Sequence, residues 1–483
     1  MTKSHCAPRM VRSGTRRLLV AGVALLSGCG NLADNTFCDG EGCAWSDRDW
    51  ALVASLAGPG PAPSDPSNAL WNDPDAARLG QQFFFDPAFS GNATQIDAIK
   101  RPSPPARAPE GSPINISCAT CHDPGHAGVD VTSVPGNVSV GAGWTDVNAL
   151  AAVNAAYRNV LFWNGRADSL WALNVIVAES ATTMGGNRLR TAHQIATRYG
   201  APFSALFGSI SLDSIAAMPS DGKPGDAAYD ALSDGDKQTV NQVMVGWAKA
   251  IAAYEQQLVS GQSPFDQFVA QGPSSNAIPV SAQRGAQLFV SKGACIDCHA
   301  GPQLTDEDFH DIGVPQSGMT VPTLEDCPAG SPCDCTTAAS TTCAPWGAYT
   351  GLAQYARSLA DPLRGDLLRT GRWSDDPNDH SRDSYVRRAL TSDLQGAWRT
   401  PSLRNVALTA PYMHDGVFAT LDDVVWHYNS GGMSSGGERV GTPAAQIKPI
   451  MLTDAEVADL VSFLESLTGT PPAAGLTDAP TLP

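Results

Sequence analysis

Two copies of one short motif constrain this chain more than any other feature. Both read Cys-x-x-Cys-His, at Cys118, Cys121 and His122 in the first copy and at Cys295, Cys298 and His299 in the second. Two thiols three positions apart can reach both vinyl groups of a haem, and the next residue then presents an imidazole to the iron. A redox dithiol needs no following histidine, and adjacent Cys-His is poor geometry for chelating zinc. The motifs therefore predict two covalently attached c-type haems.

The charge of the chain narrows the kinds of partner that fit it. Its 483 residues carry a formal net charge of −17. The first 28 residues hold five basic side chains and no acidic one, so the remaining 26 basic and 48 acidic side chains leave −22. Such a chain is a poor nucleic-acid binder, because it repels phosphates. The acidity suits docking with a small electron carrier, a cytochrome c or a cupredoxin, although it also serves solubility alone. A second copy of this chain, forming a homodimer, is a further candidate partner.

The N-terminus has the pattern of an export signal. An Arg-Arg pair precedes a short apolar run, and small residues lead up to Cys29. This order is typical of a secretory signal, here residues 1–28. The run Leu-Ser-Gly-Cys resembles a bacterial lipobox, and Gly30 resembles the sorting pattern for the outer membrane. We expect a periplasmic lipoprotein anchored through Cys29, the alternative being a cysteine that merely follows a signal.

Export also affects the interpretation of the remaining cysteines. In an oxidising compartment, cysteines outside the haem motifs are expected to form disulfides. Cys38 and Cys43 are the natural local pair. A second cluster allows three connectivities, with a zinc knot as the alternative, and comprises Cys327, Cys333, Cys335 and Cys343.

The rest of the chain divides into two helical units between irregular ends. Residues 29–75 are rich in Gly, Pro, Ser and Asp and are interpreted as a tether, and residues 470–483 as a disordered tail. Apolar residues recur at helical spacing, whereas strand-like alternation is scarce. Related segments, RLGQQFFF and RGAQLFV, precede the two motifs. The sequence therefore predicts a mainly α fold with two related units, residues 76–260 and 261–469, and long loops.

Longer segments around the motifs resemble one protein family. They include LGQQFFFDPAFSGN, NAAYRNVLFWNGRADSL, SPFDQF, CIDCHAGPQLTDEDFHDIGV and WRTPSLRNVALTAPYMHDGVFATLDDVV. The resemblance is to the bacterial di-haem cytochrome c peroxidases, especially the branch typified by the methylamine-utilisation protein MauG. It implies two mainly α-helical cytochrome c-like domains, each wrapping one covalently bound haem, with a calcium ion between them. Haem 1, in the N-terminal domain, would be the peroxidatic haem.

The second ligand of haem 2 is predicted to be Tyr428. A Thr-Leu-Asp-Asp capping box opens a helix on whose apolar face Tyr428 lies, while His427 is turned about 100° away. The resemblance points to the same residue, because this position holds Met in ordinary di-haem peroxidases and Tyr in the MauG branch. A tyrosine ligand favours ferric and high-valent iron and lowers the haem potential. Met433, Met413 and His427 remain alternatives.

The resemblance carries over to two further sites. Trp163 matches the tryptophan that lies between the haems, a relay for electrons or holes, although a purely structural tryptophan is the alternative. Three residues match the calcium ligands of the family, namely Asn148, Thr409 and Pro411. Amide and backbone oxygens suit a hard cation whose shell is completed by water.

The peroxidatic site departs from the family pattern. The family places a Gln and a Glu near haem 1, and the Glu moves a proton when the O–O bond breaks. The corresponding positions here are Leu173 and Thr183, neither of which can do this. Glu179 could substitute if its segment is helical, although we interpret it as a solvated surface acid. His126 is an extra polar residue near haem 1, too close in sequence to His122 to reach the opposite face.

Three functions follow from these features. The first is a di-haem peroxidase or MauG-like oxidoreductase using peroxide or high-valent haem chemistry, in which Trp163 and Tyr428 share oxidising equivalents. The second is a peroxide-inactive electron-transfer lipoprotein. The third is an oxidase of the same fold that acts on an organic substrate in a more apolar pocket. The altered distal positions weaken the first function and Tyr428 weakens the second, which leaves the first narrowly ahead.

Overall fold

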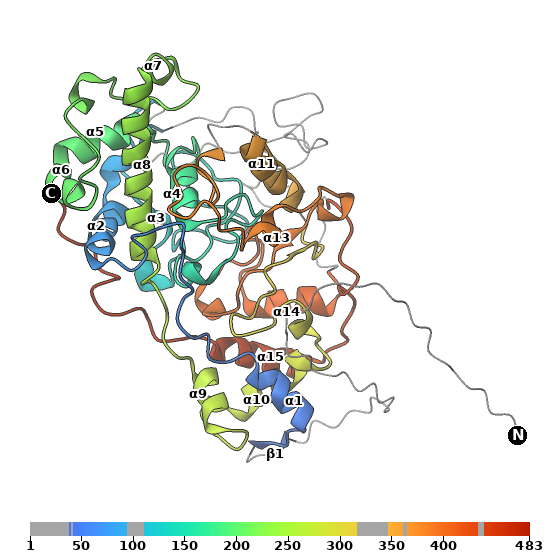
Figure 1. The fold of residues 1–483 in the computed structure, drawn as a ribbon. Helices are drawn as coiled ribbons and strands as arrows, with labels where there is room; N and C mark the ends of the chain where they lie inside the picture. The colour runs from blue at the N-terminus through green and yellow to red at the C-terminus, as the bar shows by residue number, and fades with distance from the viewer. Residues whose placement is uncertain (1–37, 40–41, 94–110, 316–345, 361–364, 433–438) are drawn as a thin grey trace, which may run out of the picture. The chain divides into compact units, whose positions relative to one another are not determined.

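The computed structural model describes residues 38–39, 42–93, 111–315, 346–360, 365–432 and 439–483. These residues are mainly α-helical, as predicted (Figure 1). Their strands form two short antiparallel pairs, β1 (Cys38–Asp39) with β2 (Gly42–Cys43) and β3 (Phe309–His310) with β4 (Trp398–Arg399). Within the described segments, no helix has both the length and the apolar character needed to cross a bilayer.

Several sequence predictions fall outside the described residues. They concern the signal segment 1–28, Cys29, Met433 and the second cysteine cluster at positions 327, 333, 335 and 343. The local cysteine pair does lie within the described part of the chain. Cys43 is disulfide-bonded, and Cys38 lies opposite it in the register of the β1–β2 pair.

The helices fall into an N-terminal and a C-terminal set. The N-terminal set is α1 (Asp47–Ala54), α2 (Pro74–Phe85), α3 (Cys118–Cys121), α4 (Leu170–Ala178), α5 (Arg188–Arg198), α6 (Gly200–Leu206), α7 (Ala227–Asp230) and α8 (Asp234–Glu255). The C-terminal set is α9 (Pro264–Gln271), α10 (Val280–Val290), α11 (Ala348–Ala360), α13 (Asp383–Val386), α14 (Leu421–Asn429) and α15 (Asp454–Ser466). A single 3₁₀ turn, Cys295–Asp297, carries the start of the second motif.

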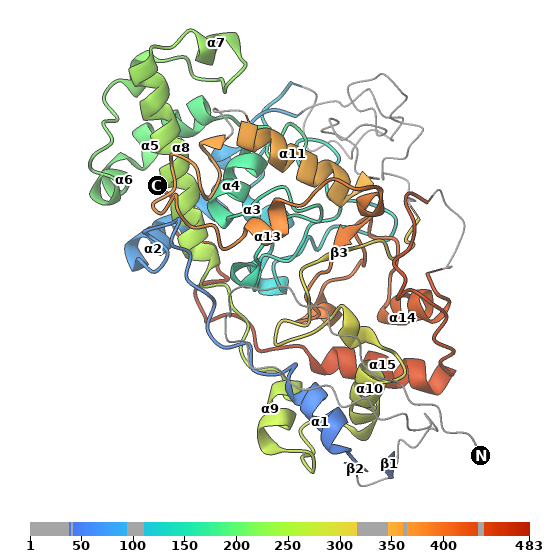
Figure 2. The same cartoon turned by 45° about the vertical axis from the view of Figure 1, so that its right-hand side comes forward.

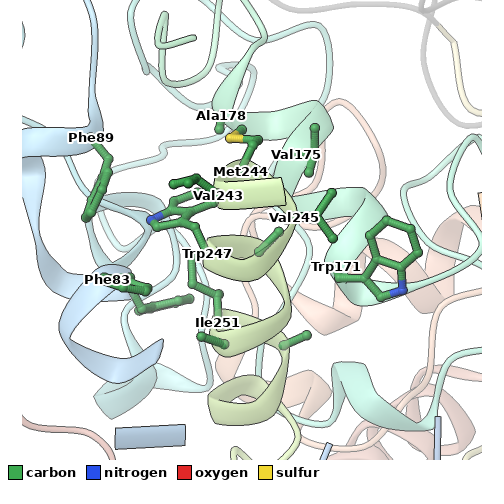
Figure 3. Close-up of a cluster of buried hydrophobic side chains, with 14 of the residues drawn as sticks. Phe83, Phe89, Trp171, Val175, Ala178, Val243, Met244, Val245, Trp247 and Ile251 are labelled. Carbon is green, nitrogen blue, oxygen red and sulfur yellow. The ribbon is translucent and has the colours of Figure 1, made fainter. Parts of the chain in front are cut away.

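The core of the N-terminal half is built around α8. Ser233 caps this helix by accepting a hydrogen bond from the Asp236 N–H. Val243, Trp247 and Ile251 recur at helical spacing and are almost completely buried. Figure 3 shows Phe83 of α2 and Phe89 just after it on one side of α8, and Trp171 and Val175 of α4 on the other. Helix α8 is therefore buried on several sides and acts as the central helix of this half.

The two sequence repeats form the same kind of helix crossing. Gly80 lies on α2 where it crosses α8, and a Cβ there would come within 1.9 Å of the Ala250 carbonyl oxygen. Gly285 lies on α10 where it crosses α15, and a Cβ there would come within 2.0 Å of the Asp459 carbonyl oxygen. Only glycine permits such close backbone approach. Each repeat therefore fixes one tight pair of helices, visible as α2 with α8 and α10 with α15 (Figure 2).

The C-terminal core is centred on the α10–α15 pair. The predicted capping box of α15 is confirmed, with Thr453 N–H donating to the Glu456 carboxylate and Glu456 N–H donating to the Thr453 hydroxyl. Arg284 on α10 makes two hydrogen bonds, 2.6 and 2.7 Å long, to the carboxylate of Asp459 on α15. Apolar residues from α9, α10 and α15 then complete one buried cluster.

The interpretation of residues 29–75 as a tether is wrong for the part after Cys43. Helix α1 lies within this segment and buries Val53 completely against the C-terminal core, together with Leu56 just beyond it. Arg404 donates a hydrogen bond of 2.9 Å to the Leu56 carbonyl. The Gly and Pro residues of this segment lie in the turns around α1. Their abundance made the short amphipathic helix hard to recognise from the composition.

The interpretation of residues 470–483 as disordered is also wrong. This tail returns from the end of α15 to the N-terminal half. The Tyr254 hydroxyl donates to the Leu476 carbonyl at 2.5 Å, the Gln81 amide donates to the Gly475 carbonyl at 2.6 Å, and Leu476 packs on the N-terminal core. The tail forms turns around Gly475 rather than a helix or a strand, so its carbonyl groups accept hydrogen bonds from side chains of the N-terminal half.

Candidate functional site

The first Cys-x-x-Cys-His motif forms one helical turn followed by a loop that holds its histidine. The His122 N–H donates to the Cys118 carbonyl at 2.9 Å, which completes the turn of α3. The His122 ring is 3.1 Å from the Gly128 carbonyl through Nδ1, so the proton lies on that nitrogen. The Nε2 lone pair is left for a metal, and burial lowers the pKa of His122, which favours the neutral imidazole that binds iron.

The second motif repeats this arrangement. The His299 N–H donates to the Cys295 carbonyl at 2.9 Å, and His299 Nδ1 donates to the Leu304 carbonyl at 2.9 Å. Burial lowers the pKa of His299 as well. Both histidines are half-buried, with one nitrogen fixed by a backbone carbonyl a few residues further along. The two sites thus present the same ligand in the same hydrogen-bonded state.

The motif cysteines are thiols in settings that suit attachment rather than redox exchange. Burial raises the pKa of Cys295 to about 12 and raises the pKa of Cys118 further. A reactive redox dithiol instead has a lowered thiol pKa, produced by a nearby cation or a helix N-terminus. The thiols, their spacing and the oriented imidazoles all fit a covalently bound haem.

A metal-capable group also lies beside the second motif. Ligand atoms of Cys298, Asp306 and His310 lie within 4.8 Å of one another. His310 Nε2 is 2.8 Å from the Asp306 carboxylate, and this hydrogen bond contributes most to raising the pKa of His310 to about 10. If Cys298 forms a thioether bond to haem, Asp306 and His310 are the only metal ligands left in this group, and they are hydrogen-bonded to each other. We therefore describe this group as part of the wall of the haem site.

Tyr428 lies close to the second motif. It is half-buried on α14, whose predicted capping box is confirmed by reciprocal hydrogen bonds between Thr420 and Asp423. Burial first, and then the nearby Cys298 and Cys295, raise the pKa of the Tyr428 hydroxyl. The phenol is therefore within electrostatic reach of both cysteines of the second motif, as a ligand of the same haem requires.

The expectation that His427 is turned away from the core is wrong. His427 is completely buried, donates from Nε2 to the Ile312 carbonyl at 2.8 Å and lies against Phe418. The physical reason is that α14 is buried on more than one face, so a single apolar stripe does not describe it. Since its Nε2 is occupied, His427 is a poor alternative ligand. Met413, the other described alternative, packs partly buried in the C-terminal core.

Trp163 lies in an aromatic group at the junction of the two halves. Its indole N–H donates to the Asn148 carbonyl at 2.9 Å. The His414 ring centroid is 6.4 Å away in an edge-on arrangement, and Trp398 stacks on His414 with ring centroids 4.1 Å apart. Burial lowers the pKa of His414 to about 3, so its imidazole is neutral. The sequence singles out Trp163, whereas Trp398 is only the first residue of the segment WRTPSLRN and receives no role from it.

Two of the three predicted calcium residues, Asn148 and Pro411, are in direct contact. The Asn148 side-chain amide is 2.9 Å from the Pro411 carbonyl, and the Asn148 N–H donates to the His414 carbonyl at 2.7 Å. The Thr409 hydroxyl donates to the Val406 carbonyl within its own turn, which leaves its backbone carbonyl as the oxygen predicted to bind calcium. An amide turned by 180° places its oxygen beside that of Pro411, and such an oxygen pair suits calcium.

Helix α4 carries Leu173, one of the two predicted distal residues, on an apolar face. Leu173, Ile176 and Val177 are the half-buried apolar residues of α4 and share one face of that helix. The Thr183 hydroxyl donates to the Val177 carbonyl at 2.6 Å, which ties it to the end of α4. Helix α4 itself contains no acidic residue.

Glu179 is neither a distal acid nor a solvated one. Its carboxylate makes two hydrogen bonds with Arg188, 2.7 and 2.8 Å long, and its side chain is only 14% exposed. The interpretation of Glu179 as a surface acid is therefore wrong, and its ion pair also prevents it from replacing the family Glu. His126 is exposed and pairs with Asp123 at 2.7 Å.

Sequence reasoning missed Glu255. This residue ends α8, is 5% exposed and accepts a hydrogen bond of 2.9 Å from Asn174 on α4. Burial raises its pKa to about 8, and its charge is felt at the Cys118 thiol. The only signal was a carboxylate at the end of a long, almost wholly apolar helical stretch.

Comparisons with known proteins agree with this geometry. The family model described as di-haem cytochrome c peroxidase matches residues 74–274. The chain is 30% identical over 468 residues to cytochrome-c peroxidase IdrP1 of Denitromonas iodatirespirans, covering 94% of this chain and 95% of that protein. It is 27% identical over 460 residues to the methylamine utilization protein MauG of Methylorubrum extorquens, with coverages of 94% and 95%.

Solved structures bear on the fold. The diheme peroxidase BthA from Burkholderia thailandensis is 23% identical, with a TM-score of 0.50, over 87% of this chain and 93% of that one. A MauG-like protein associated with microbial copper homeostasis is 22% identical, with a TM-score of 0.50, over 88% and 97%. Two oriented Cys-x-x-Cys-His sites, the helical fold and near full-length relatives lead to one conclusion. The chain belongs to the di-haem cytochrome c peroxidase and MauG family of oxidoreductases, whose members carry two c-type haems.

Proposed function

We propose that this protein is a di-haem oxidoreductase that reacts with peroxide at the first motif and passes electrons between its two sites through Trp163. The observation that carries the proposal is the matched pair of hydrogen bonds from His122 and His299 to the carbonyls of Gly128 and Leu304. Each bond holds a neutral imidazole with Nε2 ready for iron.

Each site has its own complement of residues. Cys118 and Cys121 would anchor haem 1 and Cys295 and Cys298 haem 2, with His122 and His299 as iron ligands. When bound, a c-type haem supplies the iron at which peroxide is reduced.

We assign different roles to the two sites from the residues expected opposite His122 and His299. Tyr428, close to both cysteines of the second motif, would fill the remaining ligand position there and close that site to peroxide. At the first site, Leu173, Ile176 and Val177 offer no ligand, which leaves that position open to a small oxidant. The face of α4 that carries Leu173 has no proton-accepting side chain, so we assign the proton transfer to water.

The surroundings of the two sites belong to the same proposal. Asn148 and Pro411, with water, would hold a calcium ion at the junction of the halves. The strongly acidic chain would receive electrons from a small basic carrier, a cytochrome c or a cupredoxin. We place the protein in the periplasm, anchored to the outer membrane through lipid on Cys29, a proposal that rests on the export signal and the lipobox.

A second candidate function is the oxidation of an organic substrate at the first site. The apolar face of α4 favours it, since this face would bind an apolar molecule better than it would orient hydrogen peroxide. A relay without peroxide chemistry is less favoured, because a tyrosine ligand lowers the potential of the haem it binds.

One experiment separates these functions. The purified ferric protein, shown by pyridine haemochrome to hold two c-type haems, is mixed with stoichiometric hydrogen peroxide in a stopped-flow spectrometer. A change of the haem bands within seconds supports the peroxide reaction. Unchanged bands in a protein that holds both haems would contradict it and favour the organic substrate.

A further inference from the structure

We propose that Trp398 is a second redox-active indole, which extends the relay from Trp163 toward the second haem motif. This inference rests on the proposed function, because hydrogen peroxide at the first site is the oxidant that starts the transfer. It adds a residue that neither the motifs nor the family resemblance singles out.

The first argument is the stacking of the three aromatic rings. Trp398 and His414 are stacked with ring centroids 4.1 Å apart and an interplanar angle of 20°, and His414 meets Trp163 edge-on at 6.4 Å. Trp398 and His414 are 7% and 2% exposed. Electron transfer between π systems falls steeply with their separation, so two indoles bridged by one imidazole form a short, water-poor path.

The second argument is that the backbone fixes this spacing. The Arg399 N–H, next to Trp398 on β4, donates to the Trp163 carbonyl at 2.9 Å. The Arg399 side chain donates in addition to the Phe162 carbonyl at 3.2 Å. The loop of Trp163 and the strand of Trp398 are therefore held together by two hydrogen bonds, one from the backbone and one from the side chain of Arg399. These bonds fix the distance between the two indoles.

The third argument is the position of Trp398 relative to the second motif. In the β3–β4 pair, Trp398 is directly opposite His310. His310 bonds to Asp306, and both residues lie within 4.8 Å of the Cys298 sulfur. At the other end, Phe162, adjacent to Trp163, packs against the core of the N-terminal half, and Cys118 packs against the same core. Trp398 therefore adjoins the surroundings of the second motif, and Trp163 adjoins the half that carries the first.

The electrons in this proposal balance with hydrogen peroxide as the only oxidant. Hydrogen peroxide takes up two electrons and two protons from solvent and gives two water molecules. One electron comes from the indole pair and the other from the bound haems. Trp163 loses its electron first and regains one from Trp398, which is then one electron short. No proton leaves Trp163, because its N–H is bonded to the Asn148 carbonyl, which is not a base.

The test follows the radical rather than turnover. Protein labelled with ring-deuterated tryptophan is mixed with stoichiometric hydrogen peroxide, freeze-quenched and examined by high-field electron paramagnetic resonance. We expect a tryptophan radical in the wild type and a several-fold lower yield or lifetime in Trp398→Phe. The matched control is Trp50→Phe, which removes an indole from a separate aromatic cluster with Trp45 and Phe268 and should change nothing.

Each result has a defined meaning. Wild-type radical yield and decay in Trp398→Phe would overturn the proposal and make Trp398 a packing residue. Loss of the radical in Trp163→Phe but not in Trp398→Phe would leave the proposed relay standing without its extension. A wild type whose haem bands respond to peroxide without any tryptophan radical overturns the inference alone, whereas unresponsive bands overturn the proposed function too. Should Trp398→Phe fail to bind both haems, Trp398→Tyr keeps the ring stack and is expected to replace the tryptophan radical by a tyrosyl one; its absence counts against the proposal.

Discussion

The carboxylate of Glu179 lies against the guanidinium of Arg188, joined by two hydrogen bonds of 2.7 and 2.8 Å. This buried pair occupies the acid nearest in sequence to Thr183. The family relies on an acid near this haem to move a proton, and here the equivalent position, Thr183, donates its hydroxyl to the Val177 carbonyl. Both Glu179 and Thr183 are therefore already engaged in hydrogen bonds and do not supply that acid.

Restoring the acid should accelerate the peroxide reaction. We expect Thr183→Glu to raise the rate at which peroxide changes the haem spectrum by about 10²-fold or more, because a positioned acid–base group typically contributes roughly 10²–10⁴. Stopped-flow absorbance at several peroxide concentrations measures this rate. Ala181→Glu, which adds the same charge at an exposed position nearby, is the control and should leave the rate as it is. Equal rates in both variants would argue against a missing acid as the bottleneck.

Breaking the Glu179–Arg188 pair should cost stability and spare the chemistry. The side chains are 14% and 7% exposed, so Glu179→Gln leaves a buried guanidinium without its counter-charge. We expect the free energy of unfolding to fall by about 3 kcal/mol, as measured by denaturant titration. The peroxide rate of the folded variant should equal that of the wild type. A large drop in that rate would instead assign Glu179 to the reaction.

Tyr428→Phe should change the second haem selectively. The phenol is lost while the ring is kept, so we expect altered absorption bands and a higher reduction potential for one haem only. In the absence of iron, burial raises the pKa of this hydroxyl, and the charge of a bound metal would reverse the effect and favour the phenolate. Spectroelectrochemical titration measures both potentials. Tyr385→Phe, on α13, serves as the control, and unchanged spectra in Tyr428→Phe would remove Tyr428 from the ligand set.

Glu255 should make the folded protein less stable as the pH rises. Its pKa is raised to about 8 in the folded state from a usual value of 4.5, so the folded protein holds a proton that the unfolded chain releases. Stability is therefore highest below about pH 4.5 and falls toward pH 8 by up to about 1.4 kcal/mol per pH unit for this group.

The isosteric variant Glu255→Gln isolates this contribution. It can still accept the hydrogen bond from Asn174, and it has no charge to gain. Denaturant titrations at pH 5.5 and 8.5 should show that the wild type loses more stability than the variant between these values. Parallel losses in the two proteins would mean that Glu255 is already ionised at the lower pH.

The returning tail should stabilise the N-terminal half. Tyr254→Phe removes the hydrogen bond to the Leu476 carbonyl and should lower the free energy of unfolding by about 1 kcal/mol. Ending the chain after Thr470 removes this bond together with those from Gln81 and should cost more. Limited proteolysis, followed by mass spectrometry, should then find new cuts near α2. An unchanged cleavage pattern would show that the tail contacts add little.

The sequence predicts what local chemistry dictates. The Cys-x-x-Cys-His spacing fixes both sites, and the capping boxes at Thr420 and Thr453 start their helices where expected, because these signals act within a few residues. The glycines at positions 80 and 285 lie in the repeated segments for a reason that only the helix crossings reveal.

What the sequence does not predict comes from contacts between distant segments. His427 lies on the side of α14 that a simple apolar stripe leaves polar, yet the carbonyl of Ile312 meets it there. Trp398 comes close to Trp163 only because β4 is hydrogen-bonded to the loop that carries Trp163. Helix α1 and the tail have turn-rich or Pro-rich sequences, and their order depends on surfaces that other segments supply.

The tail also imposes an order on assembly. Tyr254 meets a partner that is made 222 residues later, after both haem motifs have been synthesised. A cofactor that joins the first motif early therefore enters a half-built core whose edge beside α2 and α8 is still open. Closure comes last, when the tail lies down across that edge. The first redox centre is thus complete only once the second half of the chain has been made. A prematurely terminated chain lacks the tail and leaves the edge beside α2 and α8 uncovered.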